Sequence, residues 1–211
     1  MNTTDAKNLI VAGAGEFVKN SLTIGSWGNL SLRVGESFAI TPSGLDYSKL
    51  TTDDVVIFGE PSHRKPSSES PLHAAIYEAR SDVNAIVHTH SIFATALAAA
   101  HKDLPIITED GAMLAIDAIH CATYALAGTK ELADAALMAL GANNACLLAN
   151  HGALVCAATM KQALLFANLL EKMAKIYYLS QNLGGAKPLP EGVCAQLRKF
   201  YFGTYARLQE E

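Results

Sequence analysis

The sequence of 211 residues predicts an α/β fold in which helices cover a largely antiparallel sheet. Segments with helical periodicity and segments with strand periodicity alternate along the chain. Two pairs of strand-like segments are each joined by a short turn, and such hairpins pair their strands antiparallel. The hairpins favour this arrangement over a doubly wound parallel sheet. Half of the residues are hydrophobic, which is enough for the continuous core of one domain spanning residues 1–211.

Two regular patterns open the chain. Apolar residues at helical spacing predict a helix over 5–19, with its capping residues at 3–5. Apolar and polar residues then alternate through 28–41, and a glycine-containing turn at 35–37 divides the alternation, so we expect a hairpin there. A Pro-Ser-Gly sequence at 42–44 ends the second strand of this hairpin.

Short apolar runs and helix-start residues define the middle of the chain. Apolar runs at 55–58 and 85–88 have the length and the β-branched content of strands. A proline in the first turn predicts a helix over 71–80. Ser91 is expected to cap a further helix over 91–100.

The last third of the chain is mainly helical. Helical periodicity predicts helices over 129–140 and 159–182, and a last helix is expected after Pro190. Between the first two, a strand-turn-strand unit over 145–157 forms the second predicted hairpin. These helices are the elements that we expect to cover the sheet.

The charge pattern argues against nucleic acid and membranes as partners. The formal net charge is −4, and lysine and arginine residues are scattered rather than gathered in a stripe. Charged residues interrupt 1–19, so this segment lacks the apolar run of a secretory signal. The apolar stretch at 92–100 is far shorter than the about 20 residues that cross a bilayer. We therefore expect a cytoplasmic protein without a membrane span.

The cysteines do not indicate a metal or redox motif. They are widely separated and form no Cys-x-x-Cys pair. Cys146 and Cys156 would approach each other on adjacent strands, but without an export signal the reduced state is favoured. We expect four reduced and mostly buried side chains: Cys121, Cys146, Cys156 and Cys194.

Three histidines are candidate metal ligands. His88 and His90 follow a predicted strand, and residues i and i+2 of an extended chain face the same side. His151 stands in an Asn-His-Gly turn after an apolar run, where it would be presented toward the end of another strand. Three neutral imidazoles with an open fourth position are typical of a catalytic zinc site. Such spacing also arises by chance, and periodicity does not exclude the other histidines: His63, His73, His101 and His120.

A second polar cluster, Ser67-Ser68-Glu69, precedes the predicted helix over 71–80. Amides and hydroxyls at a helix N-terminus are a favourable place for an anion. The same serines also fit a simple capping segment, which is the commoner role. Gly28-Asn29 and Thr41-Pro42-Ser43-Gly44 likewise fit simple turns.

Taken in order, these motifs resemble those of the class II aldolase/adducin family. The motifs are Gly28-Asn29-Leu30-Ser31, Ile40-Thr41-Pro42-Ser43-Gly44, Ser67-Ser68-Glu69 with His73, His88-Thr89-His90, and Asn150-His151-Gly152. The likeness covers nearly the whole chain, and it is greatest to the family members that cleave fuculose 1-phosphate. An ordered set of motifs is far more specific than any one of them.

The resemblance implies a three-layer α/β/α fold with a central, mainly antiparallel sheet, in a homotetramer whose active sites lie between subunits. It implies a Zn²⁺ ion on His88, His90 and His151. It makes Glu69 the resting fourth ligand and catalytic acid/base, and Tyr205 the family's mobile C-terminal tyrosine, a second catalytic group. Imidazole ligands also accept Mn²⁺ or Co²⁺. The residues that match the family's substrate-phosphate pocket are Gly28, Asn29, Ser43, Gly44, Ser67 and Ser68.

The implied reaction is cleavage of a small-molecule sugar phosphate, a ketose 1-phosphate such as fuculose 1-phosphate, to dihydroxyacetone phosphate and a short aldehyde such as lactaldehyde. Glu69 favours cleavage, because related ribulose-5-phosphate 4-epimerases carry aspartate there. Glu109 stands where the fuculose-phosphate enzymes have a tyrosine, which leaves 5-deoxyribulose 1-phosphate and its methylthio analogue as alternative substrates. Further alternatives are an epimerase, a methylthioribulose-1-phosphate dehydratase and a non-catalytic, adducin-like interaction module.

Overall fold

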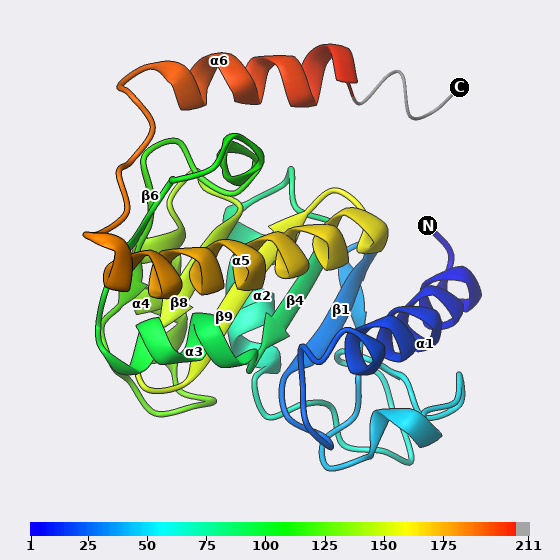
Figure 1. Cartoon of the computed structure of the whole chain (residues 1–211). Helices are drawn as coiled ribbons and strands as arrows, with labels where there is room; N and C mark the ends of the chain where they lie inside the picture. The colour runs from blue at the N-terminus through cyan, green and yellow to red at the C-terminus, as the bar shows by residue number, and fades with distance from the viewer. Residues whose placement is uncertain (206–211) are drawn as a thin grey trace.

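A sheet with helices on both faces forms the centre of the computed structural model, which describes residues 1–205 (Figure 1). For Thr204 and Tyr205 the description is limited to the backbone. Within this range the sheet has seven strands in the spatial order β3-β2-β1-β4-β9-β8-β7. They are β1 (Asn29–Val34), β2 (Ser37–Ile40), β3 (Val56–Ile57), β4 (Ala85–Thr89), β7 (Cys121–Ala122), β8 (Ala145–Leu148) and β9 (Gly152–Ala157).

Antiparallel pairing dominates the sheet. Both predicted hairpins are present, β1 with β2 and β8 with β9. The central ladder joins β4 to β9, with His88 opposite Leu154 and Thr89 opposite Ala153. Among the described residues, the one parallel ladder is that of β7 on β8, at the sheet edge. The prediction of an α/β fold with a mainly antiparallel sheet is confirmed.

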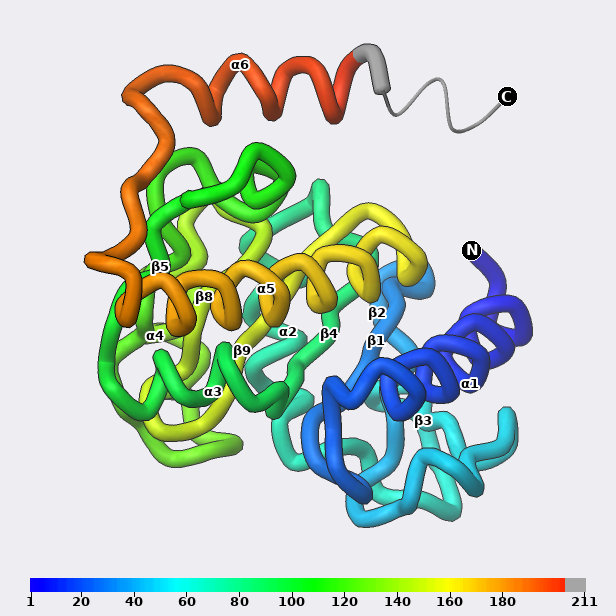
Figure 2. The backbone as a smooth tube through the Cα atoms, viewed as in Figure 1, coloured from blue at the N-terminus to red at the C-terminus, as the bar shows by residue number. Residues whose placement is uncertain are grey.

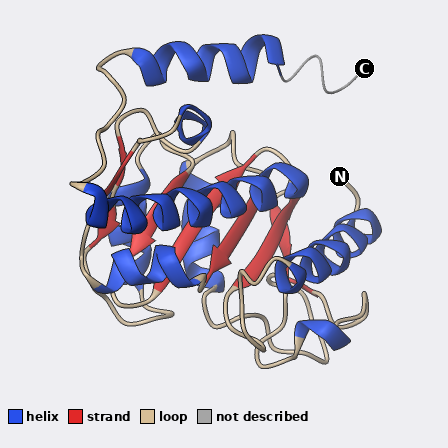
Figure 3. Cartoon of the chain, in the orientation of Figure 1, coloured by secondary structure: helices blue, strands red, loops and turns tan. Residues whose placement is uncertain are grey.

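Helices form the two outer layers, as Figure 3 shows with helices in blue and strands in red. α1, α3 and α5 cover one face of the sheet, while α2 and α4 pack together on the other. The implied three-layer arrangement is therefore confirmed. The helices are α1 (Thr3–Lys19), α2 (Ser70–Ala79), α3 (Ile92–Ala99), α4 (Lys130–Leu140), α5 (Met160–Ser180) and α6 (Val193–Lys199).

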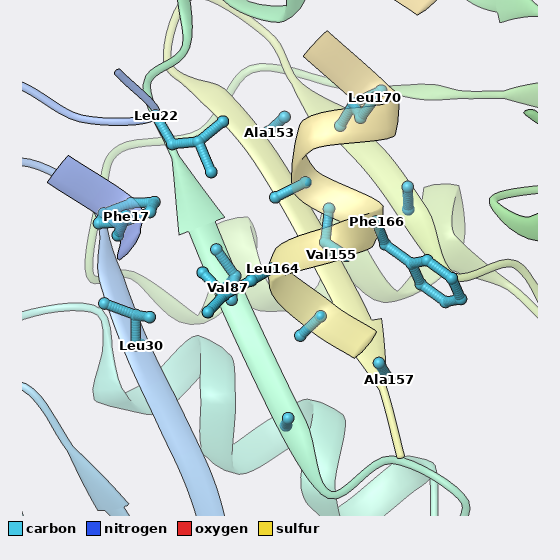
Figure 4. Close-up of a cluster of buried hydrophobic side chains, with 14 of the residues drawn as sticks. Phe17, Leu22, Leu30, Val87, Ala153, Val155, Ala157, Leu164, Phe166 and Leu170 are labelled. Atoms are coloured by element: carbon cyan, nitrogen blue, oxygen red, sulfur yellow. The ribbon is translucent and has the colours of Figure 1, made fainter. Parts of the chain in front are cut away.

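Each face of the sheet has its own apolar core, because successive strand residues point to opposite sides. On one face, Val87 and Val155 pack with apolar residues of α1 and α5, among them Phe166 (Figure 4). On the other, Ile86 and Cys156 pack against α2 and α4. His88 follows Ile86 by two residues, so it faces the α2 side, and this places it near the residues at the start of α2.

Two helix caps differ from the prediction. Asn2, one residue before the predicted capping residues, accepts the capping bond of α1. Ser91 occupies the N-cap position of α3, but its side chain makes no capping bond. Instead the carboxylate of Glu171, on α5, accepts from the N–H groups of Phe93 and Ala94, each at 2.9 Å. A residue far along the chain therefore caps α3, which local sequence does not reveal.

Between α3 and α4 the chain forms short elements that the sequence did not predict. β5 (Leu104–Pro105) pairs with β6 (Ala118–Ile119), and the 3₁₀ segment η2 (Glu109–Met113) lies between them in the chain. Figure 2 shows the chain turning back after α5 into α6. α6 packs against η2, and Arg198 donates to the carbonyls of Ala112 and Met113. The other short helical segments are η1 (Tyr47–Lys49), η3 (Gln181–Leu183) and η4 (Phe200–Tyr205).

Each of the four cysteines is free, and all except the half-buried Cys121 are buried. Cys146 and Cys156 lie on neighbouring strands, but Cys146 is opposite Leu154 rather than Cys156. None of the helices in the described range combines the length and the apolarity needed for a membrane span.

Candidate metal centre

Three imidazoles converge at one end of the central strands. The candidate ligand atoms of His88, His90 and His151 all lie within 4.8 Å of one another. Their ring centroids are 4.7 to 5.0 Å apart. His88 is in β4, His90 directly follows it, and His151 lies in the turn between β8 and β9. The alternation of an extended chain and the tight turn therefore bring together the three histidines that the sequence singled out.

Two glycines allow the chain to approach this cluster closely. A Cβ atom on Gly152 would lie 2.4 Å from the carbonyl oxygen of Thr89 and 3.3 Å from the ring of His88. Gly28 has a φ of +70°, and a Cβ atom there would lie 2.4 Å from the carbonyl oxygen of His88. A side chain at either position would push apart the strand ends that carry the histidines.

The hydrogen bond of His88 orients its ring. Nδ1 of His88 lies 3.0 Å from the carbonyl oxygen of Ala153, and a carbonyl can only accept, so Nδ1 carries a proton and Nε2 is the ring atom that faces the cluster. Nε2 of His90 lies 2.9 Å from Nε2 of His88. Burial and the neighbouring imidazoles of His88 and His151 lower the pKa of His90 to about 3. Neutral imidazole is the form that binds a metal ion.

Glu69, the residue before α2, completes the cluster. Its Oε2 lies 3.1 Å from Nε2 of His88, and its Oε1 lies 3.4 Å from Nε2 of His151. Asn29, opposite His88 on β1, donates from Nδ2 to Oε2 of Glu69 at 2.8 Å. Burial opposes ionisation of Glu69, but the histidines around it hold its pKa below the ordinary value.

The donor set fits a divalent transition-metal ion. Imidazole nitrogens and a carboxylate oxygen are all lone-pair donors, and a shared cation is the group that satisfies them together. Within residues 1–205, Oε1 of Glu69 is buried and has no hydrogen-bond donor. Metal-ligating histidines are usually held in position by a hydrogen bond from the second ring nitrogen, and the bond from Nδ1 of His88 to the carbonyl of Ala153 is of this kind.

A cavity of about 220 Å³ opens beside the cluster. Every residue predicted to bind the substrate phosphate lines this cavity, together with Glu69, His90 and His151. The complete lining is Ser26, Trp27, Gly28, Asn29, Pro42, Ser43, Gly44, Ser67, Ser68, Glu69, His90, Ala127 and His151. Six separate parts of the sequence thus meet around one space, beside the cluster of three histidines and Glu69.

Two serines of the cavity have backbone amides that are already hydrogen-bonded within the protein. The backbone N–H of Ser43 donates to Lys65 and that of Ser67 to Thr41. These two residues therefore offer an anion their hydroxyl groups rather than their amides. Glu69 itself donates its backbone N–H to Oγ of Ser67 at 3.3 Å.

Three residues of the cavity were not predicted, and Glu109 lies outside the cavity lining. Ser26, Trp27 and Ala127 line the cavity; the only sequence signal for the first two is their position directly before Gly28-Asn29. Glu109 is exposed at the start of η2 and does not line the cavity. The side chain of Tyr205 is outside the described part of the chain, so its catalytic role stays a prediction.

Of the remaining histidines, His73 is buried beneath the site. It lies on α2, and its Nδ1 is 2.6 Å from Oγ of Ser31, which is 2.8 Å from the hydroxyl of Tyr77. Burial lowers the pKa of His73 to about 3. His73 therefore belongs to a neutral hydrogen-bonded network behind Glu69 rather than to the convergent cluster.

Comparison with known proteins agrees with this geometry. A family model described as the class II aldolase and adducin N-terminal domain matches residues 8–178. A 5-deoxy-D-ribulose 1-phosphate aldolase of Bacillus thuringiensis is 40% identical over 201 residues, which cover 92% of this chain and 94% of that protein. An L-fuculose phosphate aldolase of Escherichia coli K12 is 35% identical over 202 residues, 93% of each chain.

A solved structure titled L-fuculose 1-phosphate aldolase has the same fold. It superposes with a TM-score of 0.92 at 34% identity and covers 96% of this chain and 98% of its own. The family match spans most of the sequence, and the relatives align over nearly their whole length. The chain belongs to the class II aldolase and adducin family.

Proposed function

We propose that the protein is a zinc-dependent aldolase that cleaves a ketose 1-phosphate to dihydroxyacetone phosphate and a short aldehyde. The observation that carries the proposal is the convergence of His88, His90, His151 and Glu69 beside a cavity lined by serine, asparagine and glycine. The relatives named above are aldolases of phosphorylated ketoses, which supports a lyase rather than an interaction module.

Each part of the site matches one requirement of the reaction. A divalent ion on the three histidines supplies Lewis-acid stabilisation of the negative charge that develops on the C2 and C3 oxygens of the substrate. The hydroxyls of Ser43, Ser67 and Ser68 bind the phosphate through oriented dipoles, although no cationic side chain lines the cavity.

Glu69 is the proton carrier in this scheme. When the C3–C4 bond breaks, the C4 hydroxyl loses its proton as the aldehyde forms, and Glu69, once it has taken up a proton, delivers one to C3 and so completes dihydroxyacetone phosphate; in the reverse direction the carboxylate removes the proton from C3 and the C4 oxygen gains one. Asn29 orients the carboxylate through the bond to Oε2. Tyr205 is proposed, from the family resemblance, to assist at the C4 oxygen of the substrate.

The identity of the aldehyde has two candidates. Fuculose 1-phosphate would give lactaldehyde, and it is the substrate named for the solved neighbour and the E. coli relative. 5-Deoxyribulose 1-phosphate would give acetaldehyde, and the 40% identity to an enzyme named for that substrate favours it as the second candidate. By the family resemblance, Glu109 stands where the fuculose-phosphate enzymes have a tyrosine. Both ketose 1-phosphates therefore remain candidate substrates.

Further parts of the proposal concern the whole protein. We propose one domain over residues 1–211, a homotetramer with active sites between subunits, and a cytoplasmic location. The sheet that separates two apolar cores supports one folding unit. Light scattering of the purified protein tests the tetramer.

Metal analysis combined with a substrate panel tests the activity. The purified protein is expected to hold one zinc ion per chain, to release dihydroxyacetone phosphate from at least one of the two ketose 1-phosphates, and to lose this activity after chelation. Zinc, manganese or cobalt should restore it. Full activity of metal-free protein would overturn the mechanism, and failure to cleave any ketose phosphate would overturn the proposed function.

A further inference from the structure

Trp27 has no role in the core and yet lies at the candidate site. It is the only tryptophan of the sequence, it is 66% exposed, and it lines the cavity. Its ring centroid is 5.8 Å from that of His90, with 37° between the two planes. Its position in the cavity lining makes the exposed indole available to contact a ligand bound there.

Hydrogen bonds fix the backbone of the turn that carries Trp27. Its N–H donates to the carbonyl of Ile24 at 3.3 Å, and the hydroxyl of Thr23 donates to its carbonyl. The next residue, Gly28, accepts a bond at 2.5 Å from the buried hydroxyl of Tyr47. The turn that presents Trp27 is therefore tied to the core on both sides, and the ring stands at the cavity wall without being buried.

The polar groups of the cavity and the indole of Trp27 suit different parts of a ligand. Hydroxyl, carboxylate and imidazole groups match the phosphate and the C2 and C3 oxygens, whereas the face of an indole gains most from apolar carbon. We propose that Trp27 contacts the end of the substrate remote from the phosphate and selects ketose 1-phosphates whose terminal carbon carries no hydroxyl group. This inference rests on the proposed aldolase function and narrows its substrate class.

The condensation reaction gives a matched test. Dihydroxyacetone phosphate is offered with acetaldehyde or with glycolaldehyde, which differ by a single hydroxyl group. The wild type is expected to prefer acetaldehyde in kcat/KM, and Trp27→Ala to reduce that preference about tenfold, the size of one apolar contact in a binding pocket. Trp27→Phe should restore most of the preference. Tyr124→Ala, which removes an aromatic ring of 60% exposure outside the cavity lining, is the control.

Fluorescence gives a second readout that does not need turnover. Because Trp27 is the only tryptophan, the emission of the protein reports on this position alone. In the Glu69→Gln variant, 5-deoxyribulose 1-phosphate should shift the emission to shorter wavelength and bind about tenfold more tightly than ribulose 1-phosphate.

The outcomes separate the two claims. An active enzyme whose aldehyde preference is unchanged in Trp27→Ala would overturn the inference and leave the aldolase function standing. Binding of 5-deoxyribulose 1-phosphate without a change in emission would do the same. A protein that neither cleaves nor binds either ketose phosphate would overturn the proposed function, and the inference with it.

Discussion

Asn29 and Glu69, which are 40 residues apart, share a buried hydrogen bond of 2.8 Å from Nδ2 to Oε2. Asn29 lies opposite His88 on the neighbouring strand, so the sheet register positions the group that holds the carboxylate. Oε1 of Glu69 has no hydrogen-bond donor among the described residues, and Nε2 of His151 lies 3.4 Å from it. One oxygen is therefore anchored while the other remains available for proton transfer.

Removing this anchor should slow the reaction. Asn29→Ala removes the hydrogen bond that fixes Oε2 of Glu69, and we expect kcat to fall about ten- to hundredfold, the usual effect of losing a contact that orients a site group. Steady-state kinetics measure the change. Asn168→Ala, which removes a local side-chain bond to Leu164 within α5, is the control and should leave kcat unaltered.

Glu69→Gln should separate metal binding from proton transfer. The amide has the size of the carboxylate but cannot carry the proton, so kcat should fall about 10²- to 10⁴-fold. Zinc content should stay near one per chain, because three imidazoles remain. Glu60→Gln, at an exposed turn, is the matched control. Unchanged turnover in the Glu69 variant would remove this residue from the mechanism.

Gly28→Ala should destabilise the metal-free protein. The added Cβ would meet the carbonyl oxygen of His88 at 2.4 Å in a backbone with φ of +70°, so the loss should be about 3 kcal/mol or more. Gly35 also has a positive φ, but no described atom lies within 4 Å of a Cβ there. Gly35→Ala should therefore cost only about 1 kcal/mol. Urea unfolding compares the two, and equal losses would refute the argument from close approach.

The turn that carries His151 should depend on a side-chain bond outside the cluster. Oδ1 of Asn150, a residue with φ of +55°, lies 2.6 Å from Nε2 of His101. Asn150→Gly keeps the backbone conformation but removes the bond, and zinc affinity should fall about tenfold. His101→Ala should have the same effect, and the double variant should be no weaker than either single one. Chelator competition measures these affinities; additive losses would show that the two residues act separately.

The N-terminus of α3 gives a test of capping. Glu171→Ala removes the acceptor for the N–H groups of Phe93 and Ala94 and should lower the free energy of unfolding by about 1 to 2 kcal/mol. Ser91→Ala should change it by less than about 0.5 kcal/mol, because the hydroxyl makes no capping bond. The reverse order in urea unfolding would restore Ser91 as the cap.

The sequence predicts the long elements of this fold better than the short ones. Helix α5 and the β8–β9 hairpin each contain enough residues to show a period. Strands of two residues, such as β6, contain no period, and they exist because partners elsewhere in the chain pair with them. The cap of α3 was missed for the same reason, since Glu171 is contributed by a distant helix.

The candidate site was predicted in part. Alternation in β4 and the turn before Gly152 indicated which histidines could converge, and the ordered motifs indicated the cavity residues. That these residues surround one space required the structure. Trp27 was missed because nothing in its neighbours shows that the tertiary fold leaves the indole uncovered.

The position of the imidazoles on interior strands has a consequence for how the protein responds to metal supply. β4 and β9 each have a hydrogen-bonded neighbour on both sides, so fraying at the sheet edges cannot separate His88 from the turn that holds His151. A period of metal starvation should leave the coordinating groups assembled and the chain resistant to proteolysis. Recovery would then require only the capture of an ion, without refolding or new synthesis.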